Sequence, residues 1–165
     1  MVGLGTKDGL SLMPAQDIES SFPKLRKERY EIASEETTDY NCFAWAAHDT
    51  TDWWSPMPVA GYYWPDRIPR VMSLQAFVEL YKYEGGFVPC DDGTLEAGFE
   101  KVALYVNAAG NVAHAARQTP DGAWTSKLGA MEDIQHGTLS GLEDEGTGYG
   151  KVVQFLKRAF TDRPG

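Results

Sequence analysis

The chain has 165 residues, 42% of them hydrophobic, and a formal net charge of −9, which suits one ordinary domain with its own core and disfavours binding to nucleic acid or anionic lipid. No segment approaches the ~20 apolar residues of a membrane span, and the N-terminus lacks a signal-peptide pattern, so we expect a cytoplasmic protein or one exported without a signal peptide. Two cysteines, three histidines and no metal-ligand spacing predict neither a disulfide framework nor a metal site or cofactor.

The first third of the chain contains one clear helix start. Residues 1–20 are small and polar, which predicts an N-terminal arm before a single domain over residues 21–165. The segment from Phe22 carries an apolar strip too short to assign. A largely apolar helix is then predicted across "NCFAWAA", with Thr38 or Asp39 as its N-cap, because their side-chain oxygens can accept from the free amides of the first turn. Asp49 to Thr51 are expected to end it.

An aromatic segment follows over residues 53–70, "WWSPMPVAGYYWPDRIPR". Its prolines exclude a helix, so we expect a long loop packed over the body of the domain. Two interpretations remain open. The loop covers a small satellite core, or its tryptophans, Trp53, Trp54 and Trp64, form a wall of a substrate cleft.

The remaining elements predict an α+β domain. Leu74, Phe77, Val78 and Tyr81 repeat at helical spacing after Ser73, and the helix ends at residues 85–86, "GG". Alternating patterns predict strands over 100–107, 112–118 and 123–129, and residues 149–160 close the chain as a strand or a helix. One helix, a second helix and then an antiparallel meander is the order of an α+β fold.

Cys42 lies where the first helix begins, so the free amides and positive end of that helix are expected to lower the pKa of its thiol. A nucleophilic cysteine also needs a histidine to hold the proton. His48 lies about 600° further around the helix and points away, and His136 is expected in a loop. His114 lies mid-strand between alanines, which leave room for the helix that carries Cys42. A core histidine bonded to backbone is the alternative.

The turn "TPDG", residues 119–122, favours a bulged hairpin. In that register Ala116 faces Ser126 and His114 faces Leu128, which puts Ser126 one diagonal step from His114. A plain four-residue loop would instead place Lys127 opposite His114. Gln118, on the same strand face as His114, is a further candidate to orient the imidazole.

The order of these residues resembles that of papain-like cysteine hydrolases: a cysteine at a helix start, then a histidine in a strand, then a polar residue on the next strand. The stretch "HAARQTPDGAWTSKLG" is similar to the papain segment in which histidine and alanine precede a hairpin and an asparagine, and Ser126 falls at the place of that asparagine. The resemblance implies a papain-like fold, with the nucleophile helix packed on an antiparallel sheet. Glu36 stands where papain has glutamine, so the side chain of Asn41 or a backbone amide would supply the oxyanion donor.

From Phe22 to Arg158 the chain also resembles an uncharacterised bacterial family that shares "YNCFAWA", "YWP", "EKVALY", "HAARQ", "WTSKLG", "DIQH" and "YG". Our first hypothesis is a cysteine hydrolase or acyl transferase acting on a protein, peptide or amide, with Cys42 as nucleophile, His114 as base and Ser126 or Gln118 as orienting group. The second is an inactive papain-like module that binds a protein or glycan through its aromatic loop. The third is a toxin-associated immunity protein or a small phage or secretion accessory. The sequence does not predict an oligomeric state.

Overall fold

The computed structural model describes residues 18–19, 22–28, 30–34, 37–128, 132–143 and 149–160. The expected N-terminal arm lies outside the described residues, apart from Ile18, which is buried, and Glu19. Glu36 also lies outside them.

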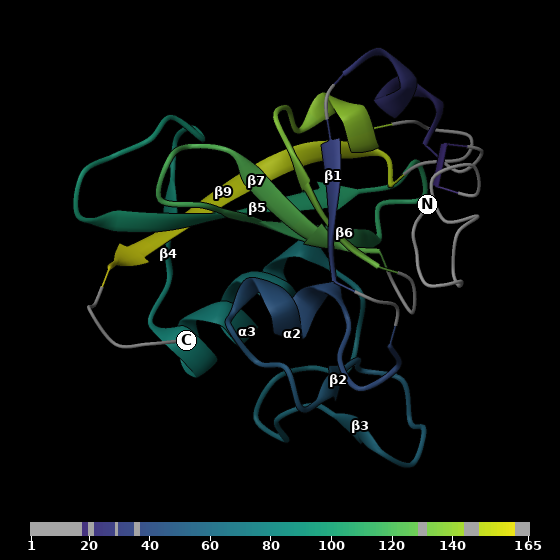
Figure 1. Ribbon diagram of the computed structural model, residues 1–165. Coiled ribbons are helices and arrows are strands. Elements are labelled where there is room, and N and C mark those ends of the chain that lie inside the picture. Colours follow the sequence, from purple (N-terminus) through teal and green to yellow (C-terminus); the bar gives the residue numbers. More distant parts are fainter. Residues whose placement is uncertain are drawn as a thin grey trace.

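The centre of the molecule is a sheet of seven strands in the order β1-β8-β7-β6-β5-β9-β4, and every neighbouring pair is antiparallel. This mostly antiparallel sheet, combined with few helices, confirms the α+β class (Figure 1). In chain order the strands are β1 (Tyr30–Ser34), β4 (Val88–Cys90), β5 (Phe99–Val106), β6 (Val112–Gln118), β7 (Trp124–Lys127), β8 (Asp133–His136) and β9 (Lys151–Ala159).

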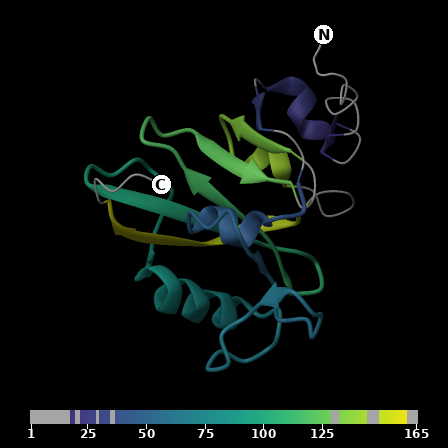
Figure 2. The ribbon, with the colours of Figure 1, turned by 60° about the horizontal axis from the view of Figure 1, so that its bottom comes forward.

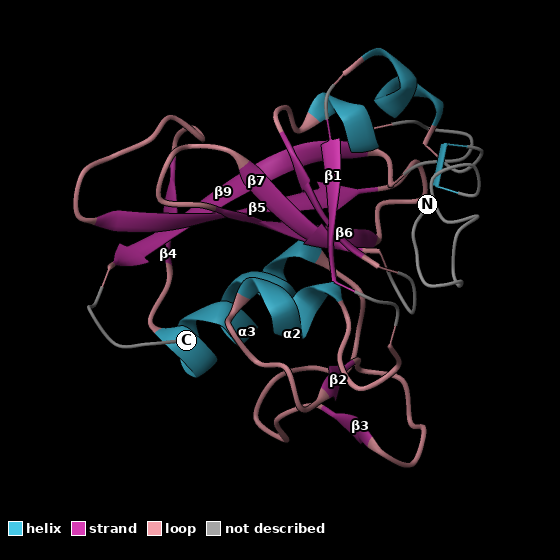
Figure 3. Cartoon of the chain, viewed as in Figure 1, coloured by secondary structure: helices cyan, strands magenta, loops and turns pink. Residues whose placement is uncertain are grey.

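Helical segments cover both faces of the sheet. The α-helices α2 (Cys42–Ala46) and α3 (Leu74–Gly85) lie on one face, and the short 3₁₀ helices η1 (Pro23–Lys27) and η2 (Ser140–Leu142) lie on the other. Figure 2 shows the sheet between these two layers, and Figure 3 shows how much of the chain is loop. Among the described residues no helix is long and apolar enough to cross a membrane.

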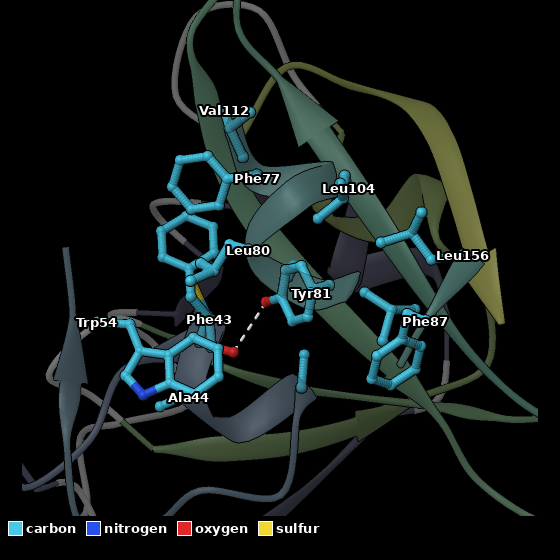
Figure 4. Close-up of a cluster of buried hydrophobic side chains, with 14 of the residues drawn as sticks. Phe43, Ala44, Trp54, Phe77, Leu80, Tyr81, Phe87, Leu104, Val112 and Leu156 are labelled. Atoms are coloured by element: carbon cyan, nitrogen blue, oxygen red, sulfur yellow. Dashed lines mark hydrogen bonds between the residues drawn. The ribbon is translucent and has the colours of Figure 1, made fainter. Parts of the chain in front are cut away.

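Each face of the sheet has its own hydrophobic core. Under α2 and α3, the side chains of Val102, Leu104 and Leu156 pack against Phe43 and other helix residues. Figure 4 shows this cluster, in which the Tyr81 hydroxyl donates a hydrogen bond to the carbonyl of Phe43 at 2.8 Å and so joins α3 to α2. The second core lies under η1 and η2 and is built on the opposite side chains of the same strands, Ala103, Tyr105, Ala116, Trp124 and Ile134.

The second helix begins where the sequence predicts. Ser73 is the N-cap, and its side chain accepts from the amide of Ala76 at 3.2 Å. The buried stripe is turned relative to the predicted one, since Ala76, Phe77, Leu80 and Tyr81 are buried while Leu74 and Val78 are only partly so. The first helix differs more, because α2 has only five residues and ends at Ala46.

The predicted hairpin between β6 and β7 is confirmed in its register. Thr119 donates its amide to the carbonyl of Ala123 at 2.8 Å, and Gly122 takes a positive φ of 94°. The backbone pairs are Arg117–Thr125 and Gln118–Trp124, as the bulged turn requires. Along these described strands the pairing stops there, so β6 and β7 separate beyond Arg117 and Thr125.

The expected aromatic loop over 53–70 contains a small second sheet. Its two strands, β2 (Trp53–Trp54) and β3 (Tyr62–Tyr63), pair in parallel. The rings of Trp53 and Tyr62 stack with centroids 6.0 Å apart. The segment lies beyond α2 and α3, away from the large sheet (Figure 1).

Candidate active site

Asn41, rather than Thr38 or Asp39, is the N-cap of α2. Its side-chain oxygen accepts from the amides of Ala44 and Trp54, both at 3.2 Å, and its side-chain nitrogen donates to the carbonyl of Trp54 at 2.7 Å. The side chain is buried and therefore fastens β2 to the start of α2. Asn41 is therefore a structural link between these two elements, and one of its two amide hydrogens stays outside these bonds for the expected role as oxyanion donor.

Asn41→Ala is expected to lower the free energy of unfolding by about 2 kcal/mol, because it removes the helix cap and leaves buried backbone groups of Ala44 and Trp54 without partners. Urea denaturation measures the loss. Asn41→Asp is the matched control. It keeps the oxygen that accepts from both amides, so it should lose less stability. Equal losses of stability in the two variants would contradict the role of the Asn41 oxygen as acceptor for both amides.

Cys42, the first residue of α2, lines a pocket of about 210 Å³. The walls come from the start of α2, the aromatic segment, β6 and the chain before β9, and they include Asn41, Phe43, Trp53, Trp54 and Tyr149. The thiol side chain is buried, with 5% of the residue exposed. The cysteine thus borders the pocket, although it is nearly closed off from solvent.

Burial raises the pKa of the Cys42 thiol to about 12, so the expected lowering of its pKa is wrong. The effects predicted from the sequence are present but weaker. Amides of Ala115, Phe43 and Cys42 itself, and the charge of Lys127, all favour the thiolate. Desolvation outweighs these effects, because the sulfur lies between packed elements, where the charged thiolate is disfavoured. The short helix α2 adds little to stabilise that charge. At neutral pH the resting thiol is therefore protonated.

His114 is fully buried in the centre of β6, and neither ring nitrogen has a hydrogen-bond partner among the described residues. Its ring stacks on Tyr149 with centroids 4.0 Å apart and planes 2° apart, and it packs edge-on against Tyr105. Burial, with a smaller contribution from the charge of His136, holds the pKa of His114 well below its usual value of 6.5. The imidazole is therefore neutral, and both its nitrogens are unused.

The expected hydrogen bond between Cys42 and His114 is not formed, since neither nitrogen of His114 has a partner. The two residues nevertheless flank the same features. The thiol lies beside the amide of Ala115, which directly follows His114. Tyr149 lines the pocket together with Cys42 and stacks on the ring of His114. Cys42 nevertheless belongs to the core under α2 and α3, whereas His114 packs on Tyr105 and Tyr149, which belong to the core on the other face of the sheet, so Tyr149 is the residue that borders both groups.

Ser126 lies on the same side of the sheet as His114, as predicted, but its hydroxyl bonds to a different histidine. It donates to Nε2 of His136 at 2.8 Å, while Nδ1 of His136 donates to the carbonyl of Thr138 at 2.8 Å. Gln118 does not orient His114 either, because its side-chain nitrogen donates to the carbonyl of Gly93 at 2.7 Å. The predicted orienting contacts to His114 are therefore wrong. His136 itself lies in β8, not in the expected loop.

Lys127, the alternative partner for His114, points to the other face of the sheet. Its buried ammonium group donates to the carbonyl of Thr37 at 2.8 Å and lies over the ring of Tyr40 at 5.3 Å. From there its charge favours the thiolate of Cys42. Lys127 thus supports the sulfur rather than the imidazole.

The three tryptophans proposed for a cleft divide into two groups. Trp53 and Trp54 line the pocket beside Cys42. Trp64 is buried against Phe77 and donates its indole hydrogen to the carbonyl of Ile68 at 3.1 Å. The aromatic segment therefore contributes to the core through Trp54 and Trp64 and to the pocket through Trp53 and Trp54.

His48 takes no part in the pocket. It follows α2 with a positive φ of 69°, accepts at Nδ1 from Arg117 at 3.1 Å and donates from Nε2 to Glu100 at 2.7 Å. This agrees with the expectation that His48 points away from Cys42. Across the described parts of the chain, no group of three or more His, Cys, Asp or Glu side chains is arranged to hold a metal ion.

Tyr149 is the residue of the pocket that the sequence reasoning missed. Its phenol ring contacts His114, and the same residue borders the pocket that contains Cys42. The signal was the dipeptide "YG" at 149–150, because glycine directly after an aromatic residue permits a close backbone approach. No hydrophobic pattern marks it, since residues 149–150 precede β9.

No curated protein and no solved structure matches the chain. A family model matches residues 31–157, which is most of the chain and includes Cys42, His114, Ser126 and Tyr149. The chain therefore belongs to the family described as a domain of unknown function, DUF7689.

Proposed function

We propose that this protein is a cysteine hydrolase or acyl transferase with a papain-like order of residues, in which Cys42 attacks the carbonyl carbon of a protein, peptide or amide substrate and His114 takes the thiol proton. The observation that carries the proposal is the unused imidazole. A buried histidine with neither nitrogen bonded is costly, and this one lies one residue from the amide that contacts the Cys42 sulfur.

The electrostatics support general-base catalysis rather than a preformed ion pair. The pKa of Cys42 is raised and that of His114 is lowered, so both groups are neutral at rest. Attack then requires the proton to move from sulfur to imidazole as the carbon–sulfur bond forms. A substrate that enters between the aromatic walls would have to shift Tyr149 or the imidazole to join the two groups.

The proposal predicts that Cys42 is acylated by p-nitrophenyl acetate. The assay uses the Cys90→Ala background, which leaves Cys42 as the only thiol of the chain, and follows the nitrophenolate burst and the acetyl mass on the intact protein. His114→Ala is expected to slow acylation by about 10²–10⁴-fold, the usual contribution of a general base. His48→Gln is the matched control and should acylate like the parent, because His48 lies outside the pocket.

The same proposal predicts how the acylation rate of Cys42 depends on pH. Because burial holds the pKa of His114 well below 6.5, the base is already neutral at pH 6.5, and acylation should stay level from there through the neutral range. A thiolate–imidazolium pair would instead give a rate that rises and falls with pH. Acylation of Cys42 no faster than that of the urea-unfolded protein, or unaffected by His114→Ala, would exclude the hydrolase.

The second candidate is the inactive binding module, and the raised pKa of the Cys42 thiol favours it. The Trp53–Tyr62 stack lies beside the pocket, and Tyr62 is 39% exposed, so an aromatic platform is available to a peptide or a sugar ring. In this case the acylation assay gives no burst at Cys42. Quenching of tryptophan fluorescence by peptides or oligosaccharides, lost in Trp53→Ala, would then identify the ligand.

A further inference from the structure

A cysteine hydrolase needs two hydrogen-bond donors for the oxyanion that forms on the substrate carbonyl. The amide of Cys42 lies close to its own sulfur and is one such donor. The side chain of Asn41 also borders the pocket, but the bonds that hold it to Ala44 and Trp54 leave it only one N–H to donate. A donor that borders both the sulfur and the proposed base would be better placed.

Besides Asn41, four side chains with a hydrogen-bond donor border the pocket, those of Trp53, Trp54, Ser55 and Tyr149. The indole hydrogen of Trp54 is donated to Asp49 at 2.8 Å, whereas Ser55, which accepts from the amide of Met57 at 3.2 Å, keeps its hydroxyl hydrogen to donate. Trp53 stacks on Tyr62 in the aromatic segment. Only Tyr149 also contacts the proposed base, through the parallel stack at 4.0 Å on His114. It is thus the single donor that borders both the nucleophile and the base.

We propose that the Tyr149 hydroxyl is the second oxyanion donor, acting together with the Cys42 amide; this assignment rests on the proposed function. In the acylation step the thiol proton moves to His114 and a carbon–sulfur bond forms. The carbonyl π pair moves to oxygen, which accepts hydrogen bonds from Tyr149 and from the Cys42 amide. Collapse restores the carbonyl, and the leaving group departs with its bonding electrons and takes the proton from His114. Water then attacks the thioester and gives its proton to His114, which returns it to the sulfur as the acid product leaves.

The surroundings of Tyr149 suit a fixed donor. Its ring is held by His114 on one face and by Phe22 at 4.8 Å and Tyr105 at 6.2 Å, and its amide donates to the carbonyl of Leu142 at 3.2 Å. A donor held in place before the reaction needs no reorganisation when charge develops. Burial, and then the nearby Cys42, raise the pKa of Tyr149, so the phenol keeps its proton across the working range.

Tyr149→Phe tests the assignment, because it removes the hydroxyl and keeps the ring on His114. In the Cys90→Ala background, acylation by p-nitrophenyl acetate is expected to fall about 10²–10³-fold. Alkylation by iodoacetamide should stay unchanged, because attack at its methylene carbon develops no oxyanion. Tyr105→Phe is the matched control. It removes a hydroxyl from the other ring that touches His114, one that donates to the carbonyl of Leu139, and should leave both rates unchanged.

The two proposals fail in different ways. If the parent protein acylates at Cys42 and Tyr149→Phe acylates equally fast, Tyr149 is not the oxyanion donor while the hydrolase stands. If Tyr149→Phe slows both reagents equally, the hydroxyl acts on the sulfur, and the assignment is again overturned. If the parent protein shows no acylation at Cys42, the proposed function fails and the role of Tyr149 falls with it.

Discussion

His114→Leu is expected to make the protein less sensitive to acid, because the wild type loses up to about 1.4 kcal/mol of stability for each pH unit below 6.5 through this residue. The cause is the mismatch between the folded and unfolded states. Unfolded, the imidazole has its ordinary pKa of 6.5, whereas burial in β6 holds the folded value well below this. Below pH 6.5 the unfolded state therefore binds a proton at His114 that the folded state does not bind.

The sign of the effect follows from that uptake. Above pH 6.5 neither state binds the proton, so stability does not depend on it. Below pH 6.5 the free energy of unfolding falls by about 1.4 kcal/mol for each pH unit, until the folded pKa is reached. The pKa of His136 is also lowered, mainly by burial, so it adds to the loss. Leucine at position 114 removes only the contribution of His114.

Urea denaturation of the wild type and His114→Leu at pH 7.5, 6.5, 5.5 and 4.5 measures the difference. The variant should be no less stable than the wild type at pH 7.5, because leucine replaces two polar atoms that have no partner, and clearly more stable at pH 4.5. If the unfolding free energies of the wild type and the variant fall in parallel with pH, then His114 binds a proton in the folded state as readily as in the unfolded state, and the prediction is wrong. If His114→Leu stabilises the protein and His114→Ala ends acylation, then His114 serves the reaction at a cost in stability.

Local signals predicted local structure well. The Ser73 cap, the end of α3 at the two glycines and the "TPDG" turn each depend on residues within a few positions of one another, and each was found. The short strands β1, β4 and β8 were not assigned, since three to five residues hold too little periodicity. Their place in the sheet is decided by partners that are distant in sequence.

The elements that carry the proposed site residues were predicted better than the contacts of those residues. The register placed Ser126 on the face of His114, but β6 and β7 part beyond Arg117–Thr125, whereas β7 stays paired with β8. Ser126 therefore reaches His136, its diagonal neighbour on β8. In the same way, the position of Cys42 at a helix start was right, but its burial is a tertiary property, and burial decides its pKa.

Gly150→Ala is expected to cost about 4 kcal/mol or more in the free energy of unfolding and to displace Tyr149 from His114. Gly150 has a φ of 89°, where an L side chain is strained. A Cβ built there would also overlap the carbonyl oxygen of Val106 and lie 2.6 Å from Cα of Asn107. Both atoms belong to the backbone and cannot turn aside, so the chain around Gly150 has to move away from the end of β5.

Gly110→Ala separates the strain from the overlap. Gly110 has nearly the same φ, 87°, but a Cβ there meets nothing within 4 Å, so it should cost only the roughly 1–2 kcal/mol of an unfavourable φ. The difference between the variants, read from urea denaturation, measures the close approach alone. Equal losses would show that the chain before β9 adapts freely. The ring current of Tyr149 shifts the NMR signals of the His114 ring, so loss of those shifts reports that the two rings have separated. A larger loss of stability in Gly150→Ala, together with loss of those shifts, would show that this glycine holds the tyrosine in the pocket.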